Sequence, residues 1–272
     1  MSLVLHLSDT HFGTERSEVS AALLNLAQEV QPDVAILSGD VTQRARRGQF
    51  DAARRFLDAL AAPVKLVIPG NHDIPLFNLA ARLFNPYGNY RRAFGLELEP
   101  QFSSKDFLVI GVNTTRPWRH KDGEVSAQQI ENVSQQLQRA LPNQLRIVAV
   151  HQPVFVERES DCVDLLHGHN LAIQAWAEAG ADLILSGHIH LAYVRNLREQ
   201  LPKLPRPIWT ASAGTAVSKR VREGQPNSVN LIRYDHAQLP QVCQVDRLDF
   251  DATSSRFIIA KTTLMELSLE LS

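Results

Sequence analysis

The chain has 272 residues, of which 44% are hydrophobic and 21% are charged, and its formal net charge is −1. This size fits one large domain, or one domain with an appended piece, and it is enough to bury a sizeable hydrophobic core. The near-neutral charge excludes a global electrostatic attraction to nucleic acid or to an anionic membrane, and no stretch approaches the run of about 18 apolar residues that crosses a bilayer.

In chain order, short apolar runs alternate with helical patterns over the first two thirds of the sequence. Strands are predicted at residues 3–7, 34–37, 64–68, 107–112, 146–150 and 183–185. Helices, in which apolar side chains recur on one face, are predicted at residues 17–30, 49–61, 127–141 and 170–180. This alternation of strands and helices predicts an α/β fold.

The pattern changes at two places. Residues 76–100 are rich in Arg, Tyr, Phe and Asn and do not fit a simple crossover, so we expect them to form a rim or lid. After about residue 205 four further strands with short turns are predicted, at residues 208–213, 228–234, 242–250 and 256–263. These strands predict an antiparallel β-element that completes or covers the sheet.

Polar clusters directly follow five of the predicted strands. They are Asp9-Thr-His11, Gly39-Asp40, Gly70-Asn71-His72-Asp73, His151, and Gly187-His188-Ile-His190. Each cluster alone is more often a turn or an incidental histidine than a binding site. Because ligands of open α/β sheets bind beyond the carboxyl ends of the strands, the five clusters together predict one site at that edge.

The residue types in these clusters suit a pair of divalent cations. Imidazole, carboxylate and amide oxygen ligands bind manganese, iron, zinc or magnesium (Mn²⁺, Fe²⁺ or Fe³⁺, Zn²⁺, Mg²⁺), and thiolates are not needed. Two such ions about 4 Å apart clamp the attacking and leaving oxygens of a displacement at phosphorus. The predicted ligands are Asp9, His11, Asp40, Asn71, His151, His188 and His190, with Asp40 as the candidate bridge between the two ions.

These motifs, in this order, resemble the calcineurin-like metallophosphoesterase superfamily, and the bacterial class III cyclic-nucleotide phosphodiesterase-like proteins in particular. The resemblance spans residues 9–190. It implies a four-layer α/β/β/α fold with two central sheets in a single domain over residues 1–272. In that domain residues 1–204 form the catalytic core, and the strands of residues 205–272 complete the second sheet.

The resemblance also implies a division of the ligands. One ion would be held by Asp9, His11, Asp40 and His190, and the other by Asp40, Asn71, His151 and His188. His72 would protonate the leaving oxygen or stabilise the transition state, Asp73 would orient His72, and a metal-bridging hydroxide would attack phosphorus. Many relatives carry Gly-Asp-x-x-Asp at the second motif, whereas this chain ends it with Gln43, which weakens any assignment to a subfamily.

Several residues near these motifs have two interpretations. Asn113 and Arg116 follow a strand and are candidate substrate contacts. Arg44, Arg46 and Arg47 form either a positive rim for an anionic substrate or a solvated approach to a helix. The second group either contacts the substrate, by stacking on a base or pairing with phosphate, or holds the irregular segment together; it contains Tyr87, Tyr90, Arg91 and Arg92. The stretch 213–228, with Lys219-Arg220-Val-Arg222, is a candidate edge of the pocket.

The location follows from what the sequence lacks. Cys162 and Cys243 form neither a CxxC pair nor a disulfide framework, which favours a reducing compartment. The N-terminal residues have neither the basic region nor the apolar run of a signal peptide. We therefore expect a cytoplasmic protein that does not bind membranes.

The expected activity is hydrolysis of a small phosphate ester, with a phosphodiester such as a 3′,5′-cyclic nucleotide as the leading substrate. A phosphomonoesterase and a nucleotide pyrophosphohydrolase remain alternatives, because the same pair of ions serves all of them. A nuclease is disfavoured by the near-neutral charge, so no extended nucleic acid partner is expected. A non-catalytic scaffold is disfavoured by the intact ligand set, and a homodimer through the C-terminal strands is a further expectation.

Overall fold

The computed structural model describes residues 1–235, 237 and 242–267, which form two six-stranded sheets. In the first sheet the spatial order is β12-β11-β10-β1-β2-β3. These strands are β1 (Ser2–Leu7), β2 (Val34–Ser38), β3 (Val64–Ile68), β10 (Ser228–Tyr234), β11 (Val242–Asp251) and β12 (Arg256–Glu266). Strands β1, β2 and β3 are parallel, and β10 pairs with the free edge of β1 in the antiparallel sense.

The second sheet has the order β4-β5-β6-β7-β9-β8. Its strands are β4 (Gln101–Ser103), β5 (Phe107–Gly111), β6 (Leu145–Ala149), β7 (Leu183–Ser186), β8 (Tyr193–Asn196) and β9 (Trp209–Ser212). The four inner strands are parallel, and the antiparallel strands β4 and β8 form the two edges. Because β5, β6 and β7 are buried on both faces, their sequences are mostly apolar, with Arg146 in β6 and Ser186 at the end of β7 as the polar exceptions.

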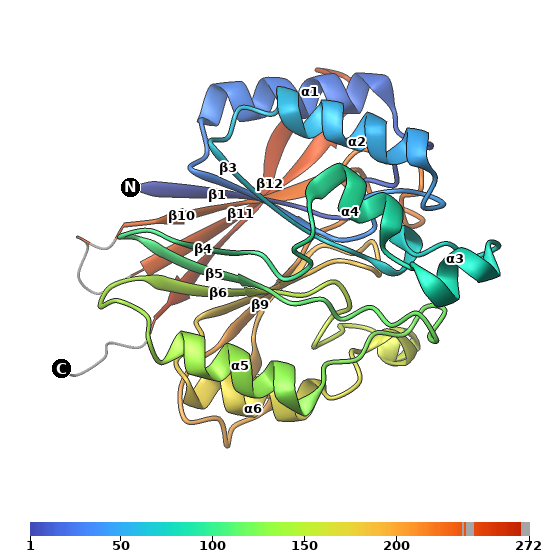
Figure 1. Ribbon diagram of the computed structural model, residues 1–272. Helices are drawn as coiled ribbons and strands as arrows, with labels where there is room; N and C mark the ends of the chain where they lie inside the picture. The colour runs from blue at the N-terminus through green and yellow to red at the C-terminus, as the bar shows by residue number, and fades with distance from the viewer. Residues whose placement is uncertain (236, 238–241, 268–272) are drawn as a thin grey trace.

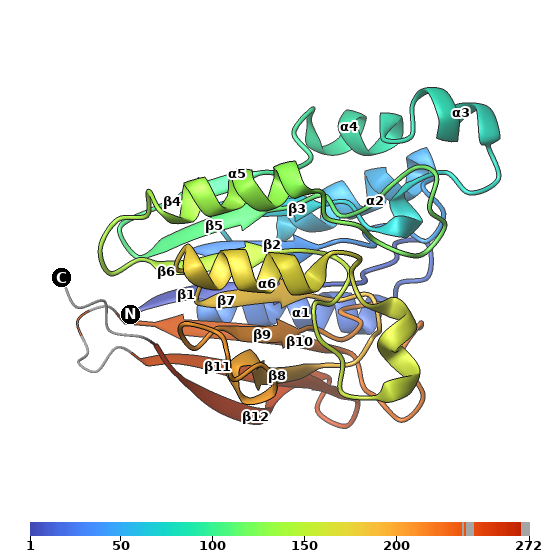
Figure 2. The same cartoon turned by 90° about the horizontal axis from the view of Figure 1, so that it is seen from below.

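Helices cover the outer face of each sheet (Figures 1 and 2). Helices α1 (Ser17–Val30) and α2 (Arg47–Ala59) lie on the first sheet, and α5 (Ala127–Leu137) and α6 (His169–Glu178) lie on the second. A third apolar cluster joins the facing sides of the two sheets. The hydroxyl of Ser126 accepts a hydrogen bond from the amide of Gln129 at the start of α5, as the sequence predicted. The predicted α/β class is confirmed.

The segment predicted as an irregular rim contains two short helices, α3 (Leu79–Phe84) and α4 (Gly88–Phe94), beside the first sheet (Figure 2). The side chain of Tyr90 in α4 is fully buried, and its hydroxyl donates to the carbonyl of Val67 at 2.6 Å. Tyr87 is also buried, with its hydroxyl bonded to Thr115. These two tyrosines therefore hold the segment to the core, which decides between the two interpretations that the sequence allowed for them.

The C-terminal strands require a correction. The sequence prediction had residues 205–272 complete the second sheet, but only β9 joins it. Strands β10, β11 and β12 extend the first sheet instead, because β1 has β2 on one side only and offers its other edge to β10. The end of the predicted segment, residues 268–272, lies outside the described residues.

The fold brings the carboxyl ends of β1, β2, β3, β6 and β7 to the edge of the sandwich opposite the N-terminus (Figure 1). All five strands run parallel within their sheets, so the loops that follow them leave from the same side. Among the described residues, no helix combines the length and apolar character needed to cross a bilayer.

Candidate metal centre

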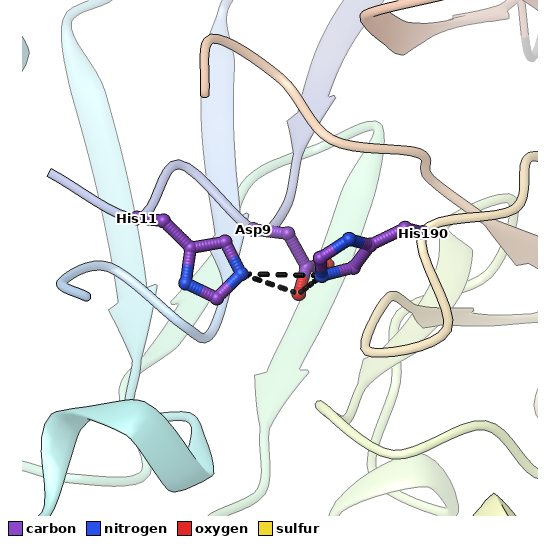
Figure 3. A group of neighbouring side chains, drawn as sticks. All are labelled: Asp9, His11 and His190. Atoms are coloured by element: carbon purple, nitrogen blue, oxygen red, sulfur yellow. Dashed lines mark hydrogen bonds and ion pairs between the residues drawn. The ribbon is translucent and has the colours of Figure 1, made fainter. Parts of the chain in front are cut away.

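The loops after β1 and β7 bring together the first group of predicted ligands, Asp9, His11 and His190 (Figure 3). Nε2 of His190 lies 3.2 Å from Oδ1 of Asp9 and 3.1 Å from Nε2 of His11. The ring of His11 also approaches Asp9, with 3.6 Å between Nε2 and Oδ1. Two ligand atoms from the loop after β1 and one from the loop after β7 therefore lie close together.

A second group forms beside it from the loops after β2, β3, β6 and β7. Nε2 of His151 lies 3.3 Å from Oδ1 of Asp40, 3.2 Å from Oδ1 of Asn71 and 3.3 Å from Nδ1 of His188. Nδ1 of His151 lies 2.8 Å from the carbonyl of Ser38. Because a carbonyl only accepts, Nδ1 carries a proton, and Nε2 is the ring nitrogen that faces the other members of the group.

Asp40 connects the two groups. Its Oδ2 lies 3.7 Å from Nε2 of His11, and its Oδ1 lies 3.3 Å from Nε2 of His151. One carboxylate thus presents an oxygen to each group, which is the geometry expected of a bridging ligand. The placement agrees with the role that the sequence suggested for Asp40.

The backbone at these ligands is strained. Five of them have positive φ angles: Asp9 (53°), His11 (43°), Asp40 (47°), His188 (71°) and His190 (56°). Residues other than glycine rarely adopt this left-handed region, and they cluster there at functional sites. Gly70 allows the turn after β3 to approach closely, since a Cβ there would collide with the amide nitrogen of Asp40. The turns after these strands therefore keep a strained backbone conformation that points the candidate ligands towards one another.

The charges of the buried acids are set by the surrounding imidazoles. Burial alone would raise the pKa of Asp9, but His190 and His11 lower it well below its usual value. Burial likewise opposes ionisation of Asp40, and His151 and His72 lower the pKa of that carboxyl. For His151, burial favours the neutral ring, yet the charge of Asp40 raises its pKa to about 9. Both carboxylates are therefore ionised at neutral pH.

These residues fit two divalent cations. Oδ1 of Asp9 is buried, has no hydrogen-bond partner in the described part of the chain, and faces the imidazoles of His11 and His190. Two pairs of ring nitrogens lie close together, those of His11 and His190 at 3.1 Å and those of His151 and His188 at 3.3 Å. Imidazoles that bind the same cation approach one another in this way. The donor set contains only nitrogen and oxygen, which suits the metals named from the sequence.

His72 lies beside the centre, in a 3₁₀ turn at Asn71–Asp73. Its amide donates to Oδ1 of Asp40 at 2.8 Å, and its ring Nε2 lies 4.0 Å from Oδ2 of that residue. Nδ1 lies 2.9 Å from the carbonyl of Gln43, so this nitrogen carries a proton. Nε2 therefore faces the cavity, which places it to exchange a proton with a bound substrate.

Asp73 requires a correction. The resemblance implied that it orients the ring of His72, but its carboxylate accepts hydrogen bonds from the amides of Gly70, Val41 and Thr42 and from the Thr42 hydroxyl. Burial, together with the charge of Asp40, raises the pKa of Asp73 to about 6. Asp73 therefore ties the turn after β2 to the turn after β3, and the ring of His72 is oriented by Gln43.

Asp164, which no sequence motif marks, lies in the 3₁₀ turn Glu159–Asp164. Its Oδ1 lies 3.5 Å from Nε2 of His188 and also pairs with the ammonium group of Lys121. A carboxylate at this nitrogen fixes the ring orientation that turns Nδ1 of His188 towards His151. Nothing in the spacing of residue 164 marks it, because it does not follow a strand.

We expect Asp164→Asn to weaken binding of Mn²⁺ to the apoprotein by roughly 10- to 100-fold, the usual effect of losing a carboxylate behind a histidine ligand. The dissociation constant measured by calorimetric titration tests this. Asp122→Asn is the matched control, since Asp122 is an exposed carboxylate that pairs with Arg119 and His167. Equal Mn²⁺ affinity in wild type and Asp164→Asn would contradict the role of Asp164.

A cavity of about 460 Å³ opens over the two groups. Its lining includes Asp40, Asn71, His72, His188 and His190. Five basic side chains also line it, namely Arg44, Arg82, Lys121, Arg220 and Arg222. The cavity is therefore suited to an anionic ligand, and the predicted edge at residues 213–228 contributes to it through Arg220 and Arg222.

Asn113 and Arg116 are not brought to this cavity, and their assignment as substrate contacts is corrected. Arg116 donates to the carbonyls of Asn113 and Thr115 and to the side chain of Gln129. Both residues line a separate, open depression on the surface. The side chain of Asn113 accepts hydrogen bonds from Thr115, so both side chains are held within their own loop and against α5.

Known proteins share this architecture. A family model described as calcineurin-like phosphoesterase matches residues 2–192, which contain all the predicted ligands. A probable cyclic nucleotide phosphodiesterase of Synechococcus is 26% identical over 180 residues, which cover 65% of this chain and 65% of that protein. The glycerophosphodiester phosphodiesterase GpdQ of Enterobacter lignolyticus is 34% identical over 82 residues, 26% of this chain and 29% of GpdQ.

The match therefore spans less than two thirds of either relative's length. Among solved structures, the purple acid phosphatase PPD1 from yellow lupin (Lupinus luteus) seeds has a TM-score of 0.71 at 12% identity. That similarity covers 97% of this chain and 53% of the lupin protein, and it shows a shared fold.

Proposed function

The chain belongs to the calcineurin-like phosphoesterase family, and on that basis we propose that it is a hydrolase that uses two bound metal ions to cleave phosphodiesters. The observation that carries this proposal is the pair of ligand groups that share Asp40 at the base of a cationic cavity. Asp9, His11, Asp40 and His190 would hold one ion, and Asp40, Asn71, His151 and His188 the other.

Two such cations, when bound, supply Lewis acid charge to phosphoryl oxygens and acidify a water for attack on phosphorus. The side chains of the cavity would bind the substrate and supply a proton. The basic side chains of the cavity attract the anionic substrate, and the buried carboxylates keep the ligand cluster charged. Nε2 of His72 faces the cavity next to Asp40, where, once it has taken up a proton from solvent, it can deliver that proton to the leaving oxygen.

The choice of a diester rests on the relatives. Both curated relatives are named as phosphodiesterases, one as a probable cyclic nucleotide phosphodiesterase and one as a glycerophosphodiester phosphodiesterase. We propose 3′,5′-cyclic nucleotides as the first substrates to test. Phosphomonoesters and nucleotide pyrophosphates are the alternatives, because the ligand set alone does not distinguish them.

A turnover panel tests the proposal. Protein purified without chelator and supplied with Mn²⁺ is expected to hydrolyse bis-p-nitrophenyl phosphate and cyclic nucleotides faster than p-nitrophenyl phosphate and nucleotide sugars. Chelation should abolish turnover and lower the melting temperature, since ions that bind only the folded state stabilise it. Faster cleavage of the monoester would favour a phosphatase, and absence of bound metal and of any turnover would reject the proposal.

A further inference from the structure

One arginine of the cavity is held against the catalytic histidine by neutral groups. Arg220 lies in the loop between β9 and β10, and its Nη1 is 3.2 Å from Nε2 of His72 and 3.1 Å from Oε1 of Gln43. The backbone of Arg220 is fixed as well, because its amide donates to Ser218 and its carbonyl accepts from Thr215. Hydrogen bonds therefore hold Arg220 both at its backbone and at its guanidinium, which lies beside His72.

The other well-positioned cations of the cavity already have strong partners. Arg222 forms two hydrogen bonds of 2.9 Å with the carboxylate of Asp161, and Lys121 pairs with Asp164. The guanidinium of Arg82 donates to two backbone carbonyls. These contacts neutralise or occupy the donors, so these side chains serve mainly to hold the walls of the cavity.

Arg220 differs from these side chains in its contact with the ring of His72, whereas the guanidinium of Arg44 lies over the ring of Phe77. Within residues 1–235, 237 and 242–267, no carboxylate lies within ion-pair distance of the guanidinium of Arg220, and its side-chain partners are an amide oxygen and an imidazole. Gln43 is the important neighbour, because an amide holds the guanidinium without cancelling its charge. A guanidinium has five N–H donors in a planar fork, and the contacts with Gln43 and His72 share a single nitrogen.

The position of this free charge points to a ligand. His72 joins Arg220 to the centre, since its amide donates to Asp40 and its ring faces Arg220. An anion bound at the two ligand groups would therefore lie beside the guanidinium. Arginine matches phosphate oxygens particularly well, because two parallel N–H groups can donate to two oxygens.

We propose that Arg220 binds the non-bridging phosphoryl oxygens of the substrate and that Gln43 positions it for this contact. This inference rests on the proposed function and names the residue that recognises the phosphoryl group. On binding, Arg220 exchanges its contact with Nε2 of His72 for the phosphoryl group, which leaves that nitrogen free to take up a proton from solvent beside the leaving oxygen. No bond is made or broken in this exchange.

Binding of inorganic phosphate to the Mn²⁺-loaded protein tests the inference without any turnover. Losing a hydrogen bond between charged groups costs about 1.5–3 kcal/mol, so Arg220→Ala should raise the dissociation constant of phosphate roughly 10- to 100-fold. Arg220→Lys keeps the charge but not the fork and should lie between the two. Gln43→Ala should weaken phosphate binding by less than Arg220→Ala, because the charge remains.

Lys219→Ala is the matched control, since it removes a neighbouring charge from an exposed side chain of the same loop. Metal content and melting temperature of each variant show whether the centre and the fold are intact. Phosphate affinity in Arg220→Ala that matches wild type overturns the inference, as does an equal loss in Lys219→Ala. If the wild type itself binds neither metal nor phosphate, it is the proposed function that fails.

Discussion

Replacing Asp40 with alanine is expected to remove both cations and to reduce phosphodiester turnover to the uncatalysed background. The reason is geometric, because Asp40 alone presents one oxygen to His11 and the other to His151. Without Asp40, Asp9 is the one carboxylate left among the predicted ligands. A single negative charge does not balance the charge of two divalent cations, so neither ion should stay bound. Cations held at this site would lower the pKa of water, so their loss would remove the nucleophile at neutral pH.

Elemental analysis and hydrolysis of bis-p-nitrophenyl phosphate measure the two effects together. Asp58→Ala provides a matched control, since Asp58 is an exposed carboxylate of α2 that pairs with Arg54 across one helical turn. Circular dichroism distinguishes loss of metal from loss of fold in Asp40→Ala. A folded Asp40→Ala protein that still contains two ions would show that this carboxylate does not bridge them.

The convergence of the candidate metal ligands could be predicted from the sequence because each of them lies within a few residues of a strand end. Parallel strands fix where their carboxyl ends lie, so Asp9, Asp40, Asn71, His151 and His188 converge whatever path the connections take. The short turns also help the prediction. An apolar run followed by Gly-Asp or Gly-Asn-His-Asp places a side chain that can bind a metal at the carboxyl end of a strand.

Residues from longer connections could not be predicted in this way. Asp164 lies in the connection between β6 and α6, and its contact with His188 depends on how that connection folds back over the centre. Arg220 similarly reaches His72 from a loop that follows β9. Neither position is set by strand register, so the sequence could mark the stretch around Arg220 as a candidate edge but could not identify its partner.

The sheet assignment of the last strands failed for a related reason. Local patterns show that residues 228–234 form a strand, but they do not show which free edge that strand joins. The edge of β1 and the edge of β9 were both open to it, and β10 pairs with β1 through Ser2–His6 while β8 covers β9. Long-range pairing of this kind depends on burial of side chains such as Ile232 between the sheets.

Replacing His72 with alanine should leave both cations bound and lower turnover of an alkyl phosphodiester by roughly 10²- to 10⁴-fold, the range of lost acid–base catalysis. The effect should depend on the leaving group. An alkoxide needs a proton as the bond to phosphorus breaks, whereas p-nitrophenolate is stable without one, so bis-p-nitrophenyl phosphate should lose far less activity. The ratio of the two losses reports on proton delivery.

Metal content makes this experiment decisive, because Nε2 of His72 also lies close enough to His11 and Asp40 to form a group of three ligand atoms with them. If His72 were a metal ligand, His72→Ala would lose an ion and both substrates would slow equally. Its hydrogen bond to Gln43 and its contact with Arg220 argue otherwise, because they turn Nε2 towards the cavity, where a leaving oxygen would lie. Retained metal with a selective loss on the alkyl substrate is the result expected of a proton donor.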